Sequence, residues 1–116
     1  MTFEKKGSAA LVCGEEILIT GGSSAVELLA SVRHETGCSA VILRKEQLVD
    51  DFFRLSSGIA GEVLQKFVNY QMRLAIVGDF SHYTSKPLRD FIYESNNGKQ
   101  VGFWPTVEAA LEWLDR

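Results

Sequence analysis

Residues 78–86 read GDFSHYTSK and combine a carboxylate, a histidine, three hydroxyls, a phenol and a lysine in one short segment. In a catalytic interpretation, Asp79 is a base or ligand group and His82 is its partner. Ser81 or Ser85 is then the nucleophile. In a binding interpretation, several polar side chains of this segment converge on a small molecule, namely Asp79, Ser81, Tyr83 and Lys86. Both interpretations require these side chains to share one cavity.

The same segment also has a purely structural explanation. Asp79 ends a strand, Ser85 caps the helix that follows, and Pro87 fits the first helical turn, where its missing N–H costs nothing. Tyr83 then packs at the rim of the sheet and His82 is an exposed loop residue. Because a catalytic triad is rarely built from a few consecutive residues, the sequence favours the structural interpretation and predicts no catalytic residue.

The turn Gly21-Gly22-Ser23-Ser24 is a second candidate, because a glycine-rich turn before a helix can hold an anion by its backbone N–H groups. It matches neither GxGxxG nor GxxxxGK[ST], the two phosphate-binding patterns with a known mechanism. Ser24 stands three residues before Glu27, which is the spacing of a capping box. We therefore expect a helix N-terminus at this turn, with a ligand contact as the alternative.

The other titratable residues do not predict a metal or a cofactor. The sequence contains no HExxH, no CxxC and no pair of histidines spaced with a carboxylate. Cys13 and Cys38 are expected to be small buried thiols, with a redox pair as the alternative. The neighbouring carboxylates Asp50 and Asp51 are expected to favour a helix start through the helix dipole.

Hydrophobic patterns predict the elements that position these residues. Ala40–Leu43 and Leu74–Val77 are uninterrupted apolar runs, which are typical of parallel strands buried on both faces. Between them, the serines at 56–57 predict a break between a short helical turn and a main helix, with one long helix from Asp50 as the alternative. The other predicted elements are strands at 9–13 and 17–20 around a turn at 14–16, a helix from Ser24 to Gly37, a helix carrying the stripe Ala60, Val63, Leu64, Phe67 and Val68, a helix after Ser85, a strand at 101–104 and a helix after Pro105.

The order of these elements is ββαβαβαβα. Strands separated by a single helix pair in parallel through right-handed crossovers. The predicted fold class is therefore α/β, with a mixed, mainly parallel sheet, an N-terminal β-hairpin and four helices. Ligand sites in such sheets lie beyond the carboxyl ends of the strands. This edge is predicted to carry residues 21–24, 44–45, 78–79 and 105–106.

Length and charge limit the classes of function. The chain has 116 residues, 46% of them apolar, which suits a single domain spanning residues 1–116. Its net charge of -3, without a cluster of lysine and arginine, argues against nucleic acid as a partner. No stretch has the pattern of a signal peptide or the apolar length of a membrane helix, so we expect a cytoplasmic protein with no membrane partner.

A family resemblance begins at Phe53 and extends to Val101, through FFRLSSGIAGEVLQ and AIVGDFSHYTSKPLRDFIYES. This stretch resembles a family of small bacterial proteins catalogued only as a domain of unknown function, number 4180. The resemblance spans most of the chain. Because the family has no assigned activity, it implies membership without implying a reaction.

A more distant resemblance is to the sulfate transporter and anti-sigma factor antagonist (STAS) domain. The order of elements agrees, and Ser56-Ser57-Gly58-Ile59 is similar to the D-S-S-G-L of that family, whose second serine is phosphorylated in the anti-sigma antagonists. By position, the resemblance makes Ser57 the candidate phosphorylation site, with Ser56 beside it. Leu55 replaces the family's aspartate and the connection from the preceding strand is longer, so a structural cap at either serine is the alternative.

Three functions follow as hypotheses. The favoured one is a non-enzymatic regulatory module that binds an unidentified protein partner through the surface around Ser57 and the helix after it. The alternative is a small-molecule-binding protein or enzyme that uses the carboxyl edge of the sheet around Asp79. The third is a homodimer with surface aromatics in its contact, for which Trp104, Trp113 and Tyr93 are the candidates.

Overall fold

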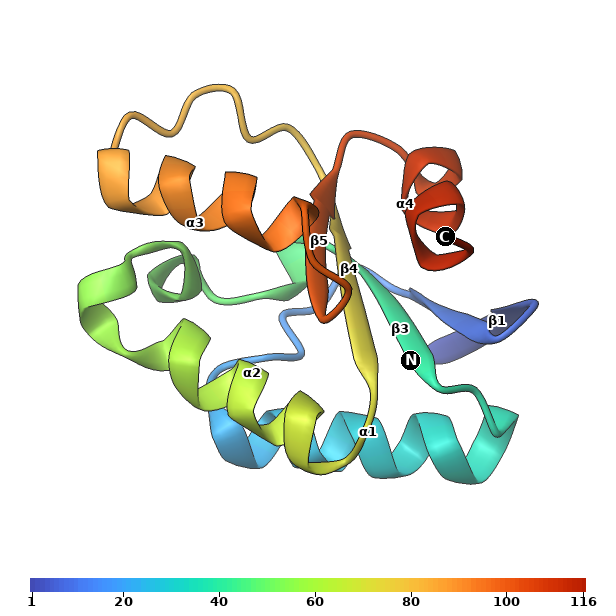
Figure 1. Ribbon diagram of the computed structural model, residues 1–116. Coiled ribbons are helices and arrows are strands. Elements are labelled where there is room, and N and C mark those ends of the chain that lie inside the picture. Colours follow the sequence, from blue (N-terminus) through green and yellow to red (C-terminus); the bar gives the residue numbers. More distant parts are fainter.

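A five-stranded sheet organises the computed structural model, which describes all residues 1–116 (Figure 1). The strands are β1 (Thr2–Lys6), β2 (Ala9–Cys13), β3 (Ala40–Arg44), β4 (Arg73–Val77) and β5 (Val101–Trp104), and they lie side by side in that order. β1 and β2 are antiparallel, whereas all other neighbours pair in parallel. The predicted α/β class with a mixed, mainly parallel sheet is confirmed.

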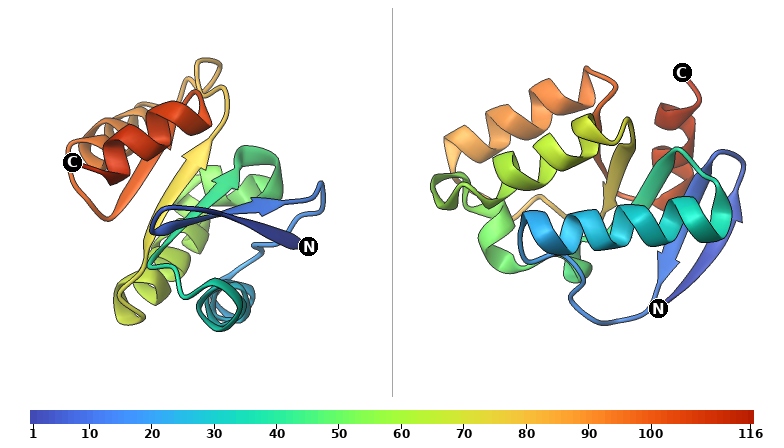
Figure 2. Two further views of the ribbon diagram at one scale, coloured as in Figure 1. Left: turned by 90° about the vertical axis from the view of Figure 1, so that its right-hand side faces the viewer. Right: turned by 90° about the horizontal axis from the view of Figure 1, so that it is seen from below.

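Helices connect the parallel strands, and the predicted order ββαβαβαβα is also confirmed. The helices are α1 (Gly22–Thr36), α2 (Ile59–Asn69), α3 (Lys86–Asn96) and α4 (Val107–Leu114). Three short 3₁₀ turns precede α2, namely η1 (Lys45–Gln47), η2 (Asp50–Phe53) and η3 (Leu55–Ser57). α1, α2 and α3 cover one face of the sheet and α4 covers the other (Figures 1 and 2). No helix has both the length and the apolar character needed to cross a membrane.

The two central strands are buried on both faces, as their apolar runs predict. On β4, Leu74 and Ile76 belong to the larger core under α1, α2 and α3, while Ala75 belongs to the smaller core under α4. All three side chains are fully buried. Neither β3 nor β4 is an edge strand, because β2 and β5 flank them.

The face under α4 includes small residues on four strands, Ala9, Ala40, Ala75 and Gly102, which let this short helix approach the sheet closely. Trp113 of α4 lies over Gly102 of β5, where a Cβ atom would come within 3.1 Å of the indole ring. Trp113 is consequently only 1% exposed, and Trp104 is half-buried beside it. The prediction that Trp113 is a surface aromatic available for a dimer contact is therefore wrong. Tyr93, in contrast, is 72% exposed.

The N-terminal hairpin exists, but its strands are not those that the sequence predicts. Ala9–Cys13 is a strand, and it pairs with Thr2–Lys6 through a turn at Gly7, whose φ of 63° favours glycine. The predicted second strand at 17–20 contributes only an isolated bridge between Ile19 and Leu48. A strand at Thr2–Lys6 is not predicted from the sequence, because four of its five side chains are polar and give no apolar pattern. Such a composition suits an edge strand that faces water.

The start of α1 also differs from its prediction. The helix begins at Gly22, so Ser24 lies inside the first turn and is not the N-cap. Its hydroxyl oxygen accepts hydrogen bonds from the backbone N–H groups of Thr20 and Gly21, at 2.8 and 3.1 Å. The capping box between Ser24 and Glu27 is therefore not formed, because the N-cap is Gly21, three residues before Ser24.

The buried stripe of α2 is narrower than the sequence indicates. Ala60, Val63 and Phe67 are buried, whereas Val68 is 49% exposed. α2 packs mainly on α1 and the 3₁₀ turns, and this contact needs one narrow row of side chains.

The outer edge of β5 is closed by a side chain from α3. The Asn96 Oδ1 atom accepts a hydrogen bond of 2.7 Å from the Phe103 backbone N–H, and Asn96 Nδ2 donates one of 3.0 Å to the Phe103 carbonyl. Both outward-facing backbone groups of Phe103 are thus satisfied within the chain.

Candidate functional site

Two loops pack on each other at the carboxyl edge of the sheet, one after β3 and one after β4. Lys45, directly after β3, donates a hydrogen bond from Nζ to the Asp79 carbonyl at 3.1 Å. The same ammonium lies 3.4 Å from His82 Nε2 and 5.2 Å from the centre of the Tyr83 ring. The predicted edge therefore does bring the segment 78–86 against a second loop, the one that leads to Ser57.

Asp79 is occupied within its own turn. Its Oδ1 atom accepts a hydrogen bond of 2.6 Å from the Ser81 hydroxyl and one of 2.9 Å from the Ser81 backbone N–H. The hydroxyl bond is the largest cause, and the backbone bond the next, of a pKa below the ordinary carboxyl value for Asp79. A carboxylate held ionised in this way is a poor general base at neutral pH.

Tyr83 is the packed centre of the loop. Its ring stacks on Phe53 at a centroid distance of 5.4 Å and on His82 at 4.5 Å. Burial raises the pKa of the phenol above its ordinary value, and the nearby carboxylates of Asp50 and Glu46 raise it further. Tyr83 therefore stays protonated at neutral pH and contributes an aromatic surface.

The four residues predicted to bind a ligand do not converge. Lys86 donates from Nζ to Asp90 Oδ2 at 2.6 Å on the exposed side of α3. Asp79, Tyr83 and Lys86 border three different hollows of the surface. Ser81 borders none of them and bonds to Asp79 instead.

Ser85 and His82 have the roles that the structural interpretation assigns to them. Ser85 is the N-cap of α3, and its hydroxyl accepts a bond of 3.4 Å from the Leu88 backbone N–H. Pro87 occupies the first turn of that helix. His82 is exposed. The loop 78–85 is thus accounted for by turn, cap and stacking interactions.

A groove of about 360 Å³ lies between this loop and the turns before α2. We call it the η3–α3 groove. Its apolar part is formed by Phe53, Leu55, Tyr83, Pro87 and Leu88. Phe53 and Leu88 are buried, whereas Leu55 and Tyr83 are half-buried and keep part of their surface accessible.

The polar lining of the η3–α3 groove consists of one guanidinium, one imidazole and three hydroxyls. Arg54, Ser56 and His82 come from both of the loops, and Thr84 and Ser85 from the loop before α3. All five residues are exposed. No aspartate or glutamate lines the groove.

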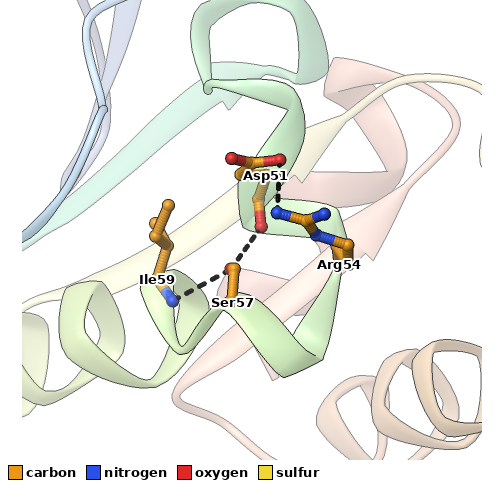
Figure 3. A network of polar contacts seen from close by, with 4 residues as sticks. All are labelled: Asp51, Arg54, Ser57 and Ile59. Atoms are coloured by element: carbon orange, nitrogen blue, oxygen red, sulfur yellow. Dashed lines mark hydrogen bonds and ion pairs between the residues drawn. The ribbon is translucent and has the colours of Figure 1, made fainter.

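Ser57 stands in a break immediately before α2, as the sequence predicts (Figure 3). Its hydroxyl donates a hydrogen bond of 2.6 Å to the Asp51 carbonyl and accepts one of 3.2 Å from the Ile59 backbone N–H. Gly58, with a φ of 80°, turns the chain into the helix. The long continuous helix from Asp50 is therefore not formed. Ser57 is half-buried and Ser56 is exposed.

In the glycine-rich turn before α1, the Gly22 backbone N–H already has a hydrogen-bond acceptor within the chain. The Gly22 backbone N–H donates a hydrogen bond of 2.8 Å to Glu62 Oε1, a side chain of the first turn of α2. A Cβ atom at Gly22 would lie 2.5 Å from the same oxygen. An anion is therefore held at this turn, but it is the protein's own carboxylate.

Arg54 is the site residue that the sequence interpretation missed. Its Nη2 atom lies 3.1 Å from Asp51 Oδ1, and both side chains are more than half exposed. The spacing of three residues between opposite charges on a helical turn was the available signal. Its relevance depends on the groove, which only the packing of two distant loops creates. No three or more His, Cys, Asp or Glu side chains gather as they would around a metal ion.

Comparison with known proteins gives one family and one fold. The family model described as "Domain of unknown function (DUF4180)" matches residues 4–114. No curated protein matches the chain.

Among solved structures, a candidate anti-sigma factor antagonist from Thermotoga maritima is similar in fold, with a TM-score of 0.52. The two sequences are 15% identical, and the match covers 99% of this chain and 94% of that chain. At this identity the similarity establishes the fold alone. The predicted STAS-like arrangement is confirmed.

Proposed function

The chain belongs to the family described as a domain of unknown function, DUF4180, and from this premise we propose that it is a non-enzymatic regulatory module that binds a protein partner through the surface around Ser57 and the start of α2. Phosphorylation of Ser57 is the switch in this proposal. The observation that carries it is the place of Ser57, half-exposed in the break before α2 of a STAS-like fold.

The resemblance to the STAS family supports this choice of residue. The second serine of the family motif corresponds by position to Ser57. The solved structure similar in fold is described as a candidate anti-sigma factor antagonist, a class of protein that acts by binding another protein.

Local electrostatics support a phosphate at this position. The start of a helix favours negative charge through its dipole and its free N–H groups. A phosphoserine adds up to about two negative charges at neutral pH. The hydroxyl would have to release the Asp51 carbonyl, but that bond is exposed to water, which can replace it. The fold should therefore tolerate the modification while a partner surface would be repelled.

The test begins with the tagged chain in native cell extract, with and without ATP. Bound proteins and phosphorylated residues are identified by mass spectrometry. We expect ATP to produce phosphate on Ser57 and to reduce the recovery of one specific partner. Phosphate on other residues only, with Ser57 unmodified, would contradict the proposal.

The identified partner is then used in direct binding measurements. Ser57→Asp should weaken its binding, with the melting temperature nearly unchanged. Ser23→Asp is the matched control, because Ser23 is an exposed serine in the first turn of α1 and the charge change is identical. Equal affinities for the two variants would contradict a role of Ser57 in docking.

The alternative function, a small-molecule binder or enzyme around Asp79, has less support. Its four side chains border different hollows, and the Asp79 carboxylate is already bonded to Ser81. A homodimer would need a surface other than buried Trp113, and exposed Tyr93 and half-buried Trp104 are the remaining aromatic candidates. We place the module in the cytoplasm, in keeping with Cys13 and Cys38, which are both free thiols.

A further inference from the structure

The η3–α3 groove differs in charge from the rest of the molecule. The chain carries a net charge of -3, yet no carboxylate lines the groove and one guanidinium does. Asp50 and Glu46 act on the Tyr83 phenol through space, but neither is part of the lining. The lining thus carries one permanent positive charge and no negative charge, with the Asp51 partner of Arg54 just outside it. Charge complementarity at Arg54 favours an acidic occupant that takes the place of Asp51.

Arg54 supplies that charge and is free to exchange its partner. It is the only lysine or arginine in the lining. Its ion pair with Asp51 is 3.1 Å long, with 65% of the Arg54 side chain exposed. An ion pair this exposed contributes little, so a carboxylate brought by a ligand can replace Asp51 at small cost.

The floor of the groove favours apolar side chains. The Tyr83 ring stacks on the buried Phe53 ring at 17° from parallel, which fixes its position. The apolar surface left accessible is that of half-buried Tyr83 and Leu55. A volume of about 360 Å³ lies at the low end for small-molecule sites. The groove is only partly enclosed, so it suits a few side chains of a bound segment better than a fully enclosed small molecule.

We propose that the η3–α3 groove binds an extended acidic segment of a protein partner, in which an apolar side chain packs on Leu55 and Tyr83 and is followed by a carboxylate on Arg54. This inference deepens the proposed function and rests on it, since it names the chemistry of the partner. Ser56, Thr84 and Ser85 provide hydroxyl donors along the same groove for the backbone of the segment.

The groove also explains how phosphate on Ser57 would act. Ser57 and Arg54 belong to the same turn, where both lie beside Asp51 (Figure 3). The Ser57 backbone N–H donates to the Arg54 carbonyl at 2.9 Å. A phosphate at Ser57 is a stronger acceptor for a guanidinium than an exposed carboxylate. It would draw Arg54 to itself and leave the groove without its permanent positive charge.

The test is a selection from a random heptapeptide display library against the immobilised full chain. Enriched peptides are then synthesised with a fluorescein label and measured by anisotropy. We expect enriched sequences to carry Asp or Glu beside a large apolar residue. Arg54→Glu should weaken the best of them about tenfold or more, while Arg54→Lys should retain most of the affinity.

Arg89→Glu is the matched control. Arg89 is exposed on α3 and borders the hollow with Lys86 and Asp90, outside the groove. Its reversal changes the net charge equally, and it should leave peptide affinity unchanged. Circular dichroism and thermal melting confirm that both variants are folded.

The outcomes separate this inference from the function on which it rests. No enrichment, enrichment of basic peptides, or equal effects of the Arg54 and Arg89 reversals would overturn the groove proposal. If Arg54→Glu abolishes peptide binding and Ser57→Asp does not, the groove is supported and the phosphoserine switch is wrong. If Arg54→Glu and Ser57→Asp both abolish peptide binding and Arg89→Glu retains it, the groove and the switch are supported together.

Discussion

Replacing Ser57 with alanine removes two hydrogen bonds from the start of α2 and leaves the charge of the protein unchanged. One bond joins the hydroxyl to the Asp51 carbonyl at 2.6 Å, and the other joins the Ile59 N–H to the hydroxyl oxygen at 3.2 Å. Together they attach turn η2 to the first turn of α2. The variant therefore tests whether Ser57 is a structural cap in the unmodified protein.

The expected cost follows from these two bonds. Ser57 precedes Gly58, the N-cap of α2. Loss of its bond from the Ile59 N–H costs about 1 kcal/mol, and loss of the exposed bond to Asp51 adds about 0.5 kcal/mol because water replaces it in part. For a domain of this size, a loss of about 1.5 kcal/mol lowers the melting temperature by about 4–6 °C.

Urea unfolding followed by circular dichroism measures this loss as a shift of the midpoint at constant slope. The control is Ser56→Ala, since Ser56 is an exposed neighbour whose hydroxyl has no hydrogen-bond partner in the chain. Ser56→Ala should change the free energy of unfolding by less than about 0.5 kcal/mol. Equal effects of the two substitutions would refute the assignment of the cap to Ser57.

Three further predictions concern the scaffold. Ile76→Asp should abolish folding, as seen by loss of the far-ultraviolet circular dichroism signal, because Ile76 is 0% exposed and an unpaired buried carboxylate costs several kcal/mol. Gly22→Ala should destabilise the wild type but much less the Glu62→Ala background, since its Cβ atom would meet Glu62 Oε1 at 2.5 Å; additive effects in a double-mutant cycle would disprove the contact. Ser81→Ala should raise the pKa of Asp79 toward its ordinary value of 3.8 in an NMR titration. Because folding lowers the Asp79 pKa, the stability that this carboxylate contributes is present above its unfolded pKa and is lost as the pH falls through its folded pKa. An Asp79 titration curve that is unchanged in Ser81→Ala would contradict the role of the Ser81 hydrogen bond.

The sequence predicted best the elements whose own residues determine them. The apolar runs of β3 and β4 are typical of strands covered on both faces, and the cap at Ser85 is a local hydrogen bond. β1 was missed because an edge strand is stabilised by its partner's backbone and needs no apolar pattern of its own. Trp113 was misplaced because its burial depends on Gly102, which lies in another element.

The candidate site was predictable only in part for the same reason. The break before α2 could be predicted from the consecutive small residues Ser56, Ser57 and Gly58. The groove beside it could not, because it requires contact between Phe53 and Tyr83, which are far apart in the sequence. These rings stack because β3 and β4 are parallel, so the loops that follow them begin at the same edge of the sheet. The filled turn at Gly22 likewise depends on Glu62, which is 40 residues away in the chain.

The amide of Asn96 imitates a neighbouring strand, with consequences for self-association. Outward-facing backbone groups alternate along an edge strand, so on β5 they belong to Val101 and Phe103, with the next position at Pro105. Asn96 saturates Phe103, and Pro105 has no N–H to offer. β5 is consequently a poor template for adding a strand from another copy, which protects this edge against fibrillar aggregation. One helical side chain and one proline thus limit strand addition at the β5 edge of the sheet.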